Sequence, residues 1–128
     1  MYNQIKLDHI ALQFKDKESA NNFFIDFLNM NLLKSFNITS TLSKSIFGID
    51  DEVEILVYSN NDVKFEVFIS NKTYLSTFNH VCIEVNDKKE FKNHCKKFEI
   101  EPIIIDKNGK KLFFIKDFSG NLYEIIEK

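Results

Sequence analysis

The stretch LDHIALQFKDKES at Leu7–Ser19 returns later in the chain as FNHVCIEVNDKKE at Phe78–Glu90. The two copies align without a gap and place His9 on His80. In each copy apolar residues alternate with other residues, which is typical of a β-strand with one buried face. A phrase written twice in one chain of 128 residues indicates an internal repeat that keeps a histidine in each copy.

A helical pattern follows each copy of the phrase. The first predicts an amphipathic helix over about 17–29, whose apolar side carries Ala20, Phe23, Phe24, Phe27 and Leu28. The second predicts a shorter helix, which Asp87 opens in a capping-box pattern with Glu90. The repeat therefore extends beyond the opening strand into a strand–helix unit.

Three strand-like segments follow each helix, and turn-forming residues separate them. These segments are 31–38, 52–59 and 63–70 in the first half, and 101–106, 110–116 and 121–127 in the second. The order strand, helix, three strands thus appears twice. We expect an α+β fold of two tandem βαβββ modules forming a curved sheet cleft, in a single domain over 1–128, with module one at about 5–71 and module two at about 76–128.

Strand alternation decides where the polar side chains of the repeat point. In each opening strand the aliphatic positions face the helix, so His9 and His80 face the other way. In each closing strand Glu66 and Glu124 stand opposite their apolar neighbours. Each module therefore supplies one histidine and one glutamate on the face away from its helix.

Paired βαβββ modules with these residues resemble the vicinal oxygen chelate superfamily, which includes glyoxalase I, bleomycin- and fosfomycin-resistance proteins, methylmalonyl-CoA epimerase and extradiol dioxygenases. The stretch DFSGNLYE at Asp117–Glu124 is similar to the closing D-P-x-G-N-x-x-E pattern of that superfamily, with Phe118 in place of proline. The resemblance covers nearly the whole chain. It implies that the two modules surround one divalent metal.

The resemblance makes His9, Glu66, His80 and Glu124 the expected metal ligands. Two imidazoles and two carboxylates suit Ni²⁺, Co²⁺, Mn²⁺, Fe²⁺ or Zn²⁺ and leave room for two waters or a chelating substrate. Such a metal polarises two neighbouring oxygens and stabilises an enediolate. Glu66 or Glu124 would then be the catalytic base, and the sequence leaves open which one.

The ligand order His, Glu, His, Glu is most similar to that of glyoxalase I-like members, which implies a metal-dependent lyase or isomerase acting on a hemithioacetal-type substrate. Gln13 and Ser70 stand where that family commonly has an Arg and an Asn for glutathione. Phe68 and Cys82 share strand faces with the expected ligands. We therefore predict Gln13, Phe68, Ser70 and Cys82 as substrate-binding residues, with a cosubstrate that differs from glutathione or is missing.

Three other functions are compatible with the sequence. An epimerase-like enzyme would transfer a proton beside a thioester, although that group usually has Gln where Glu66 stands. A bleomycin-resistance-like dimer would sequester a small molecule without catalysis, and would need no four-ligand site. A metal-free scaffold would keep the fold alone, because a fold does not fix a function. Dependence on metal distinguishes the sequestering dimer and the metal-free scaffold from the lyase.

Charge and composition exclude several partners. A net charge of −2, with all 17 basic residues being Lys, argues against a nucleic-acid partner and against an Arg-based phosphonate site. No run is apolar enough for a membrane span or a secretory signal, so we expect a cytoplasmic protein with Cys82 and Cys95 as free thiols. By analogy with the superfamily, in which a second chain often completes the cleft, we predict a homodimer. The sequence leaves open whether His9 and Glu66 meet His80 and Glu124 of the same subunit or of the other.

Overall fold

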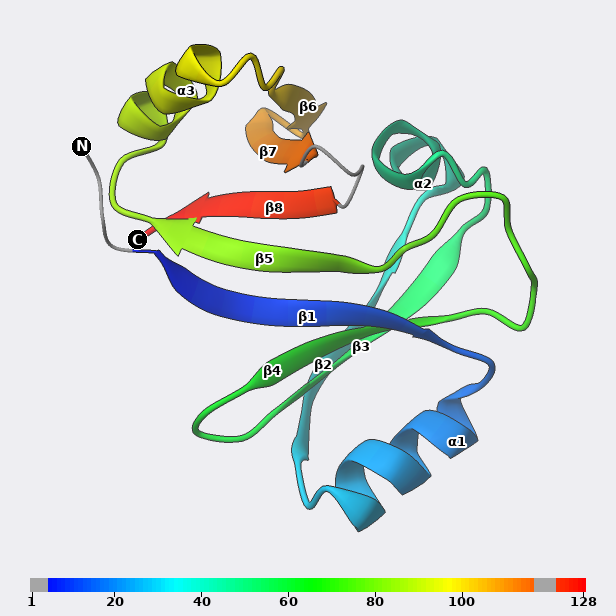
Figure 1. Ribbon diagram of the computed structural model, residues 1–128. Coiled ribbons are helices and arrows are strands. Elements are labelled where there is room, and N and C mark those ends of the chain that lie inside the picture. Colours follow the sequence, from blue (N-terminus) through cyan, green and yellow to red (C-terminus); the bar gives the residue numbers. More distant parts are fainter. Residues whose placement is uncertain (1–4, 117–121) are drawn as a thin grey trace. The chain divides into compact units, whose positions relative to one another are not determined.

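The computed structural model describes residues 5–116 and 122–128, and it divides the chain into two compact units (Figure 1). The N-terminal unit is His9–Asn79. The C-terminal unit combines Met1–Asp8 with His80–Lys128. The boundary falls inside strand β1 (Lys6–Phe14).

The N-terminal unit is built on four strands in the order β2-β3-β4-β1. Strands β2 (Asn31–Ile38), β3 (Val53–Ser59) and β4 (Lys64–Ile69) form antiparallel pairs along the chain. Strand β1 pairs in parallel with β4, which brings the first and last strands of the module side by side. This pairing places the opening histidine and the closing glutamate on neighbouring strands.

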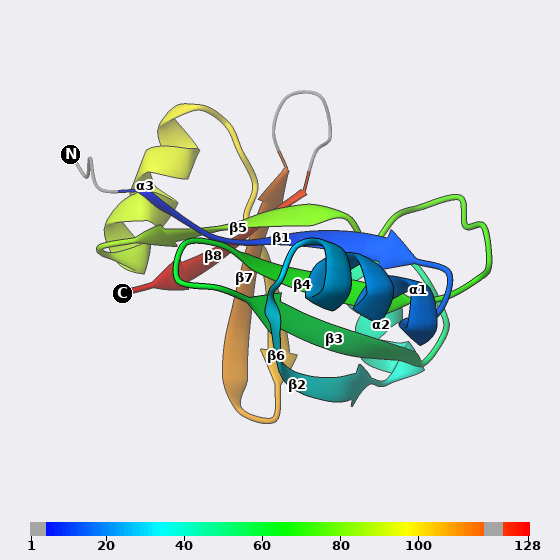
Figure 2. The same cartoon turned by 90° about the horizontal axis from the view of Figure 1, so that it is seen from below.

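One face of this sheet packs against the first helix, which begins as α1 (Lys17–Asn21) (Figure 2). Asp16 caps α1 by accepting a 2.7 Å hydrogen bond from the backbone N–H of Ser19. The core on this face consists of Ala20, Phe24, Met30, Leu56, Tyr58 and Val67, with Leu12, Phe14 and Phe65 packed against it. The aliphatic side of β1 therefore faces the helix, as strand alternation predicts.

The first helix changes its winding at Asn22, where α1 continues as the π-helix η1 (Asn22–Phe27). The backbone N–H of Leu28 bonds to the carbonyl of Phe23, five residues back, at 2.9 Å. Phe24 is buried, whereas 42% of Phe23 and 73% of Phe27 are exposed. The predicted helix is confirmed, and Phe24 is buried as expected, but the placement of Phe23 and Phe27 on its buried side is wrong. The wider winding turns Phe27 farther from the direction of Phe24 than an α-helix would.

The opposite face of the same sheet carries a helix that the repeat does not predict, α2 (Ser40–Phe47). Thr39 caps its start, and Gly48, with φ of 74°, ends it in the left-handed conformation. Phe47 at its end packs edge to face with Phe68 of β4, with ring centroids 5.3 Å apart. Helix α2 therefore lies on the side of the sheet that carries the even-numbered residues of β4, including Glu66.

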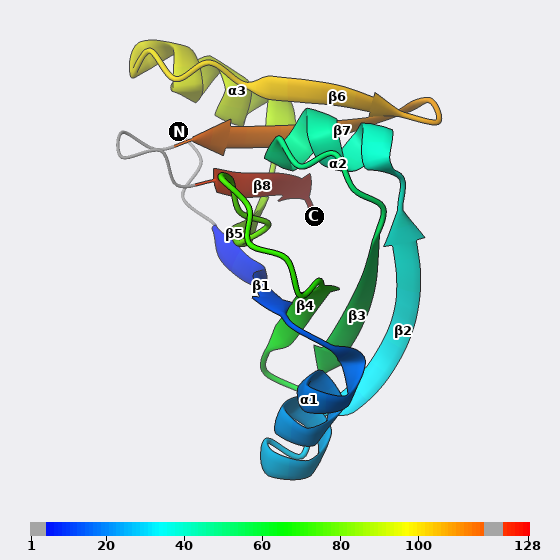
Figure 3. The same cartoon turned by 90° about the vertical axis from the view of Figure 1, so that its right-hand side faces the viewer.

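The C-terminal unit repeats the plan with strands β5 (His80–Val85), β6 (Ile103–Lys107), β7 (Lys110–Lys116) and β8 (Leu122–Glu127). Strands β6, β7 and β8 lie side by side as an antiparallel meander, and β5 pairs in parallel with β8 (Figure 3). Helix α3 (Lys88–Lys97) is capped by Asp87 and buries Phe91 and Cys95 against this sheet.

The predicted order of strand, helix and three strands is confirmed in the second half and, apart from the added helix α2 between β2 and β3, in the first, and the α+β fold is confirmed with it. The turn at Ser119-Gly120 and the D-F-S-G-N part of the closing pattern lie outside the described residues. Among the described helices, none is both long enough and apolar enough to cross a membrane. The module limits of 5–71 and 76–128 stay a prediction.

Candidate metal centre

In the N-terminal unit, His9 on β1 and Glu66 on β4 form a pair. The Nε2 atom of His9 lies 3.4 Å from Oε1 of Glu66. The imidazole is buried, with 4% of its side chain exposed, whereas 21% of the Glu66 side chain is open to solvent. The carboxylate is thus the member of the pair that a small molecule in solution can reach.

In the C-terminal unit, His80 on β5 and Glu124 on β8 form the corresponding pair. The Nε2 atom of His80 lies 3.4 Å from Oε1 of Glu124, with 2% and 20% of the two side chains exposed. Phe114 of β7 contacts the ring of His80 edge to face, with centroids 6.0 Å apart. Separation and exposure therefore agree closely between the two units.

The strand register explains this agreement. Glu66 stands directly across from Ala11 of β1, and Glu124 stands across from Cys82 of β5. Each of these strand partners follows its histidine by two residues and therefore shares its face. The parallel pairing of first and last strands thus sets the same diagonal His–Glu relation in both modules.

The donor set and its spacing fit a divalent metal. Two ligand atoms bound to one ion at about 2.1 Å stand about 3.0 to 3.4 Å apart, depending on the coordination geometry. A charge-assisted hydrogen bond between the same groups is usually shorter, about 2.7 to 2.9 Å. The observed 3.4 Å in both units agrees with ligands that share an ion. Imidazole and carboxylate together suit a first-row divalent metal.

Gln13, a predicted substrate-binding residue, has its amide donors engaged within the protein. Its side-chain N–H₂ group donates to the main-chain carbonyls of Ser70 and Lys72, each at 2.9 Å. This bridge ties the end of β1 to the segment that follows β4.

Ser70, the second polar candidate, belongs to a network in the same unit. Its hydroxyl lies 2.6 Å from the hydroxyl of Tyr74, which in turn donates to Asp51 at 3.0 Å. Lys72 adds an ion pair with Asp51 at 3.2 Å. The Tyr74 hydrogen bond first, and Lys72 second, hold the pKa of Asp51 below its ordinary value.

Phe68 and Cys82, the two apolar candidates, are covered by protein. Phe68 is 2% exposed and stacks on Phe78 with centroids 4.8 Å apart. Cys82 is fully buried in β5. Phe68 thus belongs to an aromatic cluster with Phe47 and Phe78, and direct contact of either candidate with a substrate stays a prediction.

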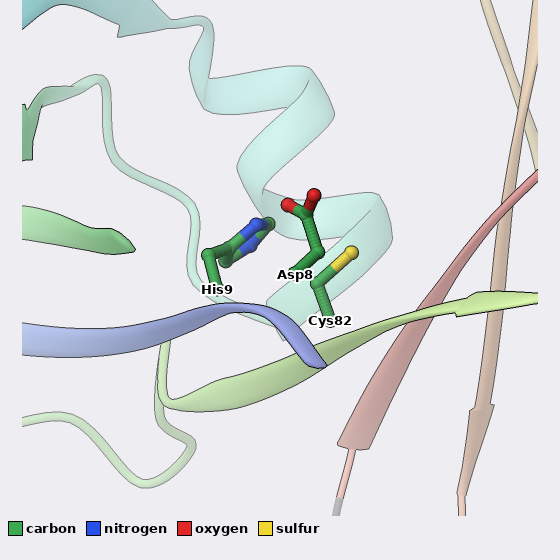
Figure 4. A group of neighbouring side chains, drawn as sticks. All are labelled: Asp8, His9 and Cys82. Carbon is green, nitrogen blue, oxygen red and sulfur yellow. The ribbon is translucent and has the colours of Figure 1, made fainter. Parts of the chain in front are cut away.

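Asp8 is a residue of this region that the sequence pattern did not single out. Strand alternation assigns it to the side of Ile10, away from the expected ligands. In the C-terminal unit its carboxylate nevertheless lies within 4.8 Å of the Cys82 sulfur. Figure 4 shows the two side chains next to each other. The only sign of Asp8 in the sequence is its position directly before His9.

No family model and no curated protein matches the chain. Among solved structures, a hypothetical protein from Bacillus halodurans C-125 matches with a TM-score of 0.70 at 20% identity, covering 98% of this chain and 96% of that one. Methylmalonyl-CoA epimerase from Mycobacterium tuberculosis matches with 0.64 at 14% identity, covering 94% and 86%.

A glyoxalase/bleomycin resistance protein/dioxygenase superfamily member from Vibrio splendidus 12B01 matches with a TM-score of 0.62 at 12% identity, covering 98% of this chain and all of that one. Identities in this range establish likeness of fold. The superfamily resemblance seen in the sequence is confirmed at that level, and glyoxalase I itself is not singled out. The chain has the vicinal oxygen chelate fold of the glyoxalase/bleomycin resistance/dioxygenase superfamily.

Proposed function

We propose that this protein is a divalent-metal-dependent enzyme that moves a proton at a carbon atom beside a carbonyl group of a small substrate. The observation that carries the proposal is the His–Glu pair, which recurs in both units with the same 3.4 Å separation. A repeated module can carry a structural pair twice, but this gives no reason for each carboxylate to stay partly exposed beside a buried imidazole. A shared function of the four side chains accounts for the repetition.

In this proposal His9, Glu66, His80 and Glu124 hold one metal, which supplies Lewis-acid polarisation of substrate oxygens. The buried imidazoles serve only as ligands, since they are nearly closed to solvent. Glu66 and Glu124 keep about a fifth of their side chains exposed. A base must come within hydrogen-bond reach of the proton that it abstracts, so one of these carboxylates removes and returns the proton.

For the reaction itself we propose a glyoxalase I-like lyase or isomerase that acts on a hemithioacetal-type substrate. An epimerase acting beside a thioester is the second candidate. Gln13 and Ser70 are engaged in internal hydrogen bonds, which favours a reaction that does not use them as ligands for glutathione. The fold is also that of methylmalonyl-CoA epimerase from Mycobacterium tuberculosis. Both reactions need the same proton transfer.

We further propose that the protein is a cytoplasmic homodimer. No disulfide joins Cys82 and Cys95, which suits a reducing compartment. In such a dimer, His9 and Glu66 of one subunit and His80 and Glu124 of the other would share a metal. Size-exclusion chromatography with light scattering tests the dimer.

The metal is tested by equilibrium dialysis of the chelator-stripped protein against Ni²⁺, Co²⁺, Mn²⁺ and Zn²⁺. We expect one metal per chain, lost in both His9→Ala and His80→Ala. His94→Ala is the matched control, because the third histidine lies on α3 with its ring against Phe98. Two metals per chain, with one surviving each single substitution, would show that the pairs act separately. Absence of binding in the unaltered protein would refute the proposal.

Catalysis is tested separately on the metal-loaded protein. Hemithioacetals of methylglyoxal with several thiols, and short branched acyl thioesters, are incubated in D₂O and followed by proton NMR. We expect exchange of the proton beside the carbonyl group, with loss of exchange in Glu66→Gln or Glu124→Gln. Tight metal binding without exchange of any of these substrates would contradict the enzyme and favour a protein that sequesters its ligand.

A further inference from the structure

We propose that Gln13 is a positioning residue of the site and not a substrate ligand. It acts by fastening the segment 70–79, here called the strap, onto the face of the N-terminal sheet that carries Glu66. This inference rests on the proposed function, because it assigns a role in the same site. The contacts that carry it lie entirely within the N-terminal unit.

The first fastening is the side-chain amide of Gln13. Its two donor hydrogens match the two carbonyl groups that it meets, those of Ser70 and Lys72, both at 2.9 Å. The backbone N–H of Ser70 also bonds to the carbonyl of Phe14 at 3.0 Å. The end of β1 therefore holds the start of the strap at three points.

The second fastening joins the strap to the chain after α2. The Ser70, Tyr74 and Asp51 side chains form a continuous hydrogen-bonded row, with separations of 2.6 and 3.0 Å. The backbone N–H of Lys72 donates to the Ser70 hydroxyl at 3.2 Å, and its ammonium group pairs with Asp51. The strap is thus fixed to β1 on one side and to the α2–β3 connection on the other.

The strap in turn carries aromatic side chains onto β4. Phe78 stacks on Phe68 at 4.8 Å, and Tyr74 contacts Phe78 edge to face at 5.5 Å. Phe68 follows Glu66 by two residues in β4 and shares its face. The strap and α2 therefore build an aromatic wall on the face of β4 that carries the carboxylate that we assign to metal and proton, with Phe68 two residues from Glu66. A shift of this wall changes the space in which a substrate can lie against Glu66.

The repeat supports a special role for Gln13. The equivalent position in the second copy is Glu84, four residues after His80 as Gln13 is four residues after His9. An ionised carboxylate has no hydrogen to donate, so Glu84 cannot make the two bonds that Gln13 makes. The fastening of the strap by this side chain is therefore a feature of one module, whereas the metal ligands belong to both.

The test compares Gln13→Met, which keeps the length of the side chain but removes its donors, with Tyr74→Phe, which keeps the ring on Phe78. The first readout is the rate of tryptic cleavage after Lys72 in the strap, relative to cleavage at Lys107 and Lys110 beside the β6–β7 turn of the other unit. The other readouts are metal affinity, kcat and KM in the metal-loaded protein.

We expect cleavage after Lys72 to become at least about tenfold faster in each variant, because each loses two hydrogen bonds and a single one accounts for up to about tenfold. Metal affinity should stay within about twofold, because the His–Glu pairs are untouched, while KM rises several-fold. A higher KM with unchanged cleavage in Gln13→Met would show direct contact with substrate and overturn the inference. Faster cleavage with unchanged KM and kcat would also overturn it. Failure of the proposed function would give a different result, namely no metal binding by the unaltered protein.

Discussion

His80 keeps its Nε2 atom 3.4 Å from Oε1 of Glu124, and the first module reproduces this separation in its own pair. The relation depends on the parallel pairing of the first and last strands, which sets each glutamate diagonally across from its histidine. Two copies of one geometry have a direct consequence for mutation. Equivalent substitutions in the two modules should have equivalent effects.

We therefore predict that Glu66→Gln and Glu124→Gln weaken metal binding to a similar degree. An amide keeps the volume of the side chain but removes the negative charge that a divalent ion requires. We expect each loss to exceed about 100-fold, the upper range for residues that only support a metal ligand. Titration calorimetry with Zn²⁺ and Ni²⁺ measures both constants. Glu84→Gln, a neutral amide on the same face of β5, should leave the affinity unchanged, and a large effect of only one of the two ligand substitutions would contradict the equivalence.

The π-helix gives a second prediction, because it separates Phe24 from Phe27 in burial. Phe24 is 1% exposed and stacks on Tyr58 at 4.8 Å, whereas Phe27 is largely exposed. Phe24→Ala should cost about 3 to 5 kcal/mol of the free energy of unfolding, as do other fully buried aromatic residues. Phe27→Ala should change it by less than about 1 kcal/mol. Urea unfolding followed by circular dichroism measures both, and equal losses would mean that the helix continues with ordinary α-helical winding.

Much of the fold could be predicted because it depends on patterns that a sequence displays. Strand alternation gave the sides of β1 and β4, and the repeated phrase gave the order of elements in both modules. The exposure of Phe27 could not be predicted from such a pattern. Apolar spacing identifies a helix, but the hydrogen-bond step within it, from Leu28 back to Phe23, is set by packing of the whole unit.

Helix α2 and the strap show two different reasons for a missed feature. Helix α2 had local signals, since Thr39 is a suitable first cap and Gly48 a suitable end. The repeat does not predict it, because the second module has no helix between the corresponding strands β6 and β7. The hydrogen bonds of Gln13 had no local signal, because its two partners lie 57 and 59 residues farther along the chain. Contacts of that range depend on the register of β1 against β4.

The ionised Asp51 side chain gives a prediction in acid. Its pKa is lowered in the folded protein, first by the Tyr74 hydrogen bond and then by Lys72. A carboxyl group with a lowered pKa stabilises the fold above its unfolded-state pKa of about 3.9, and this contribution is lost as the pH falls through the folded-state value. Asp51→Asn should therefore be less stable than the unaltered protein at pH 7 and should approach it as the pH falls through the folded-state pKa of Asp51.

Urea midpoints of the two proteins at pH 7 and in acid measure this difference. Asp106→Asn is the control, because Asp106 makes only a 3.8 Å surface pair with Lys111 in which both side chains are more than half exposed. An isolated exposed pair contributes little to stability. A gap between Asp51→Asn and the unaltered protein that stays constant with pH would contradict an ionic origin.

Tyr58 gives the corresponding prediction in base. Its ring is fully buried, and its hydroxyl donates a 2.7 Å hydrogen bond to Oδ1 of Asn21. Burial first, and the Glu54 carboxylate second, raise the pKa of Tyr58 to about 12. The folded protein then holds the phenolic proton more tightly than the unfolded chain, whose tyrosines ionise near pH 10. The stability that Tyr58 provides is complete below about pH 10 and is lost as the pH rises toward about 12, by up to about 3 kcal/mol.

Tyr58→Phe lacks both the hydrogen bond and this ionisation. At pH 8 it should be about 1 kcal/mol less stable than the unaltered protein, the usual net value of one hydrogen bond. Between pH 10 and about 12 the gap should close and then reverse. Only the unaltered protein has a phenol that loses its proton in the unfolded chain but must keep it, or ionise while buried, in the folded protein. Guanidinium unfolding at several pH values measures the gap, and ionisation of lysines cancels because both proteins carry the same ones. A gap that is independent of pH would show that the Tyr58 hydroxyl ionises in the folded protein as readily as in the unfolded chain.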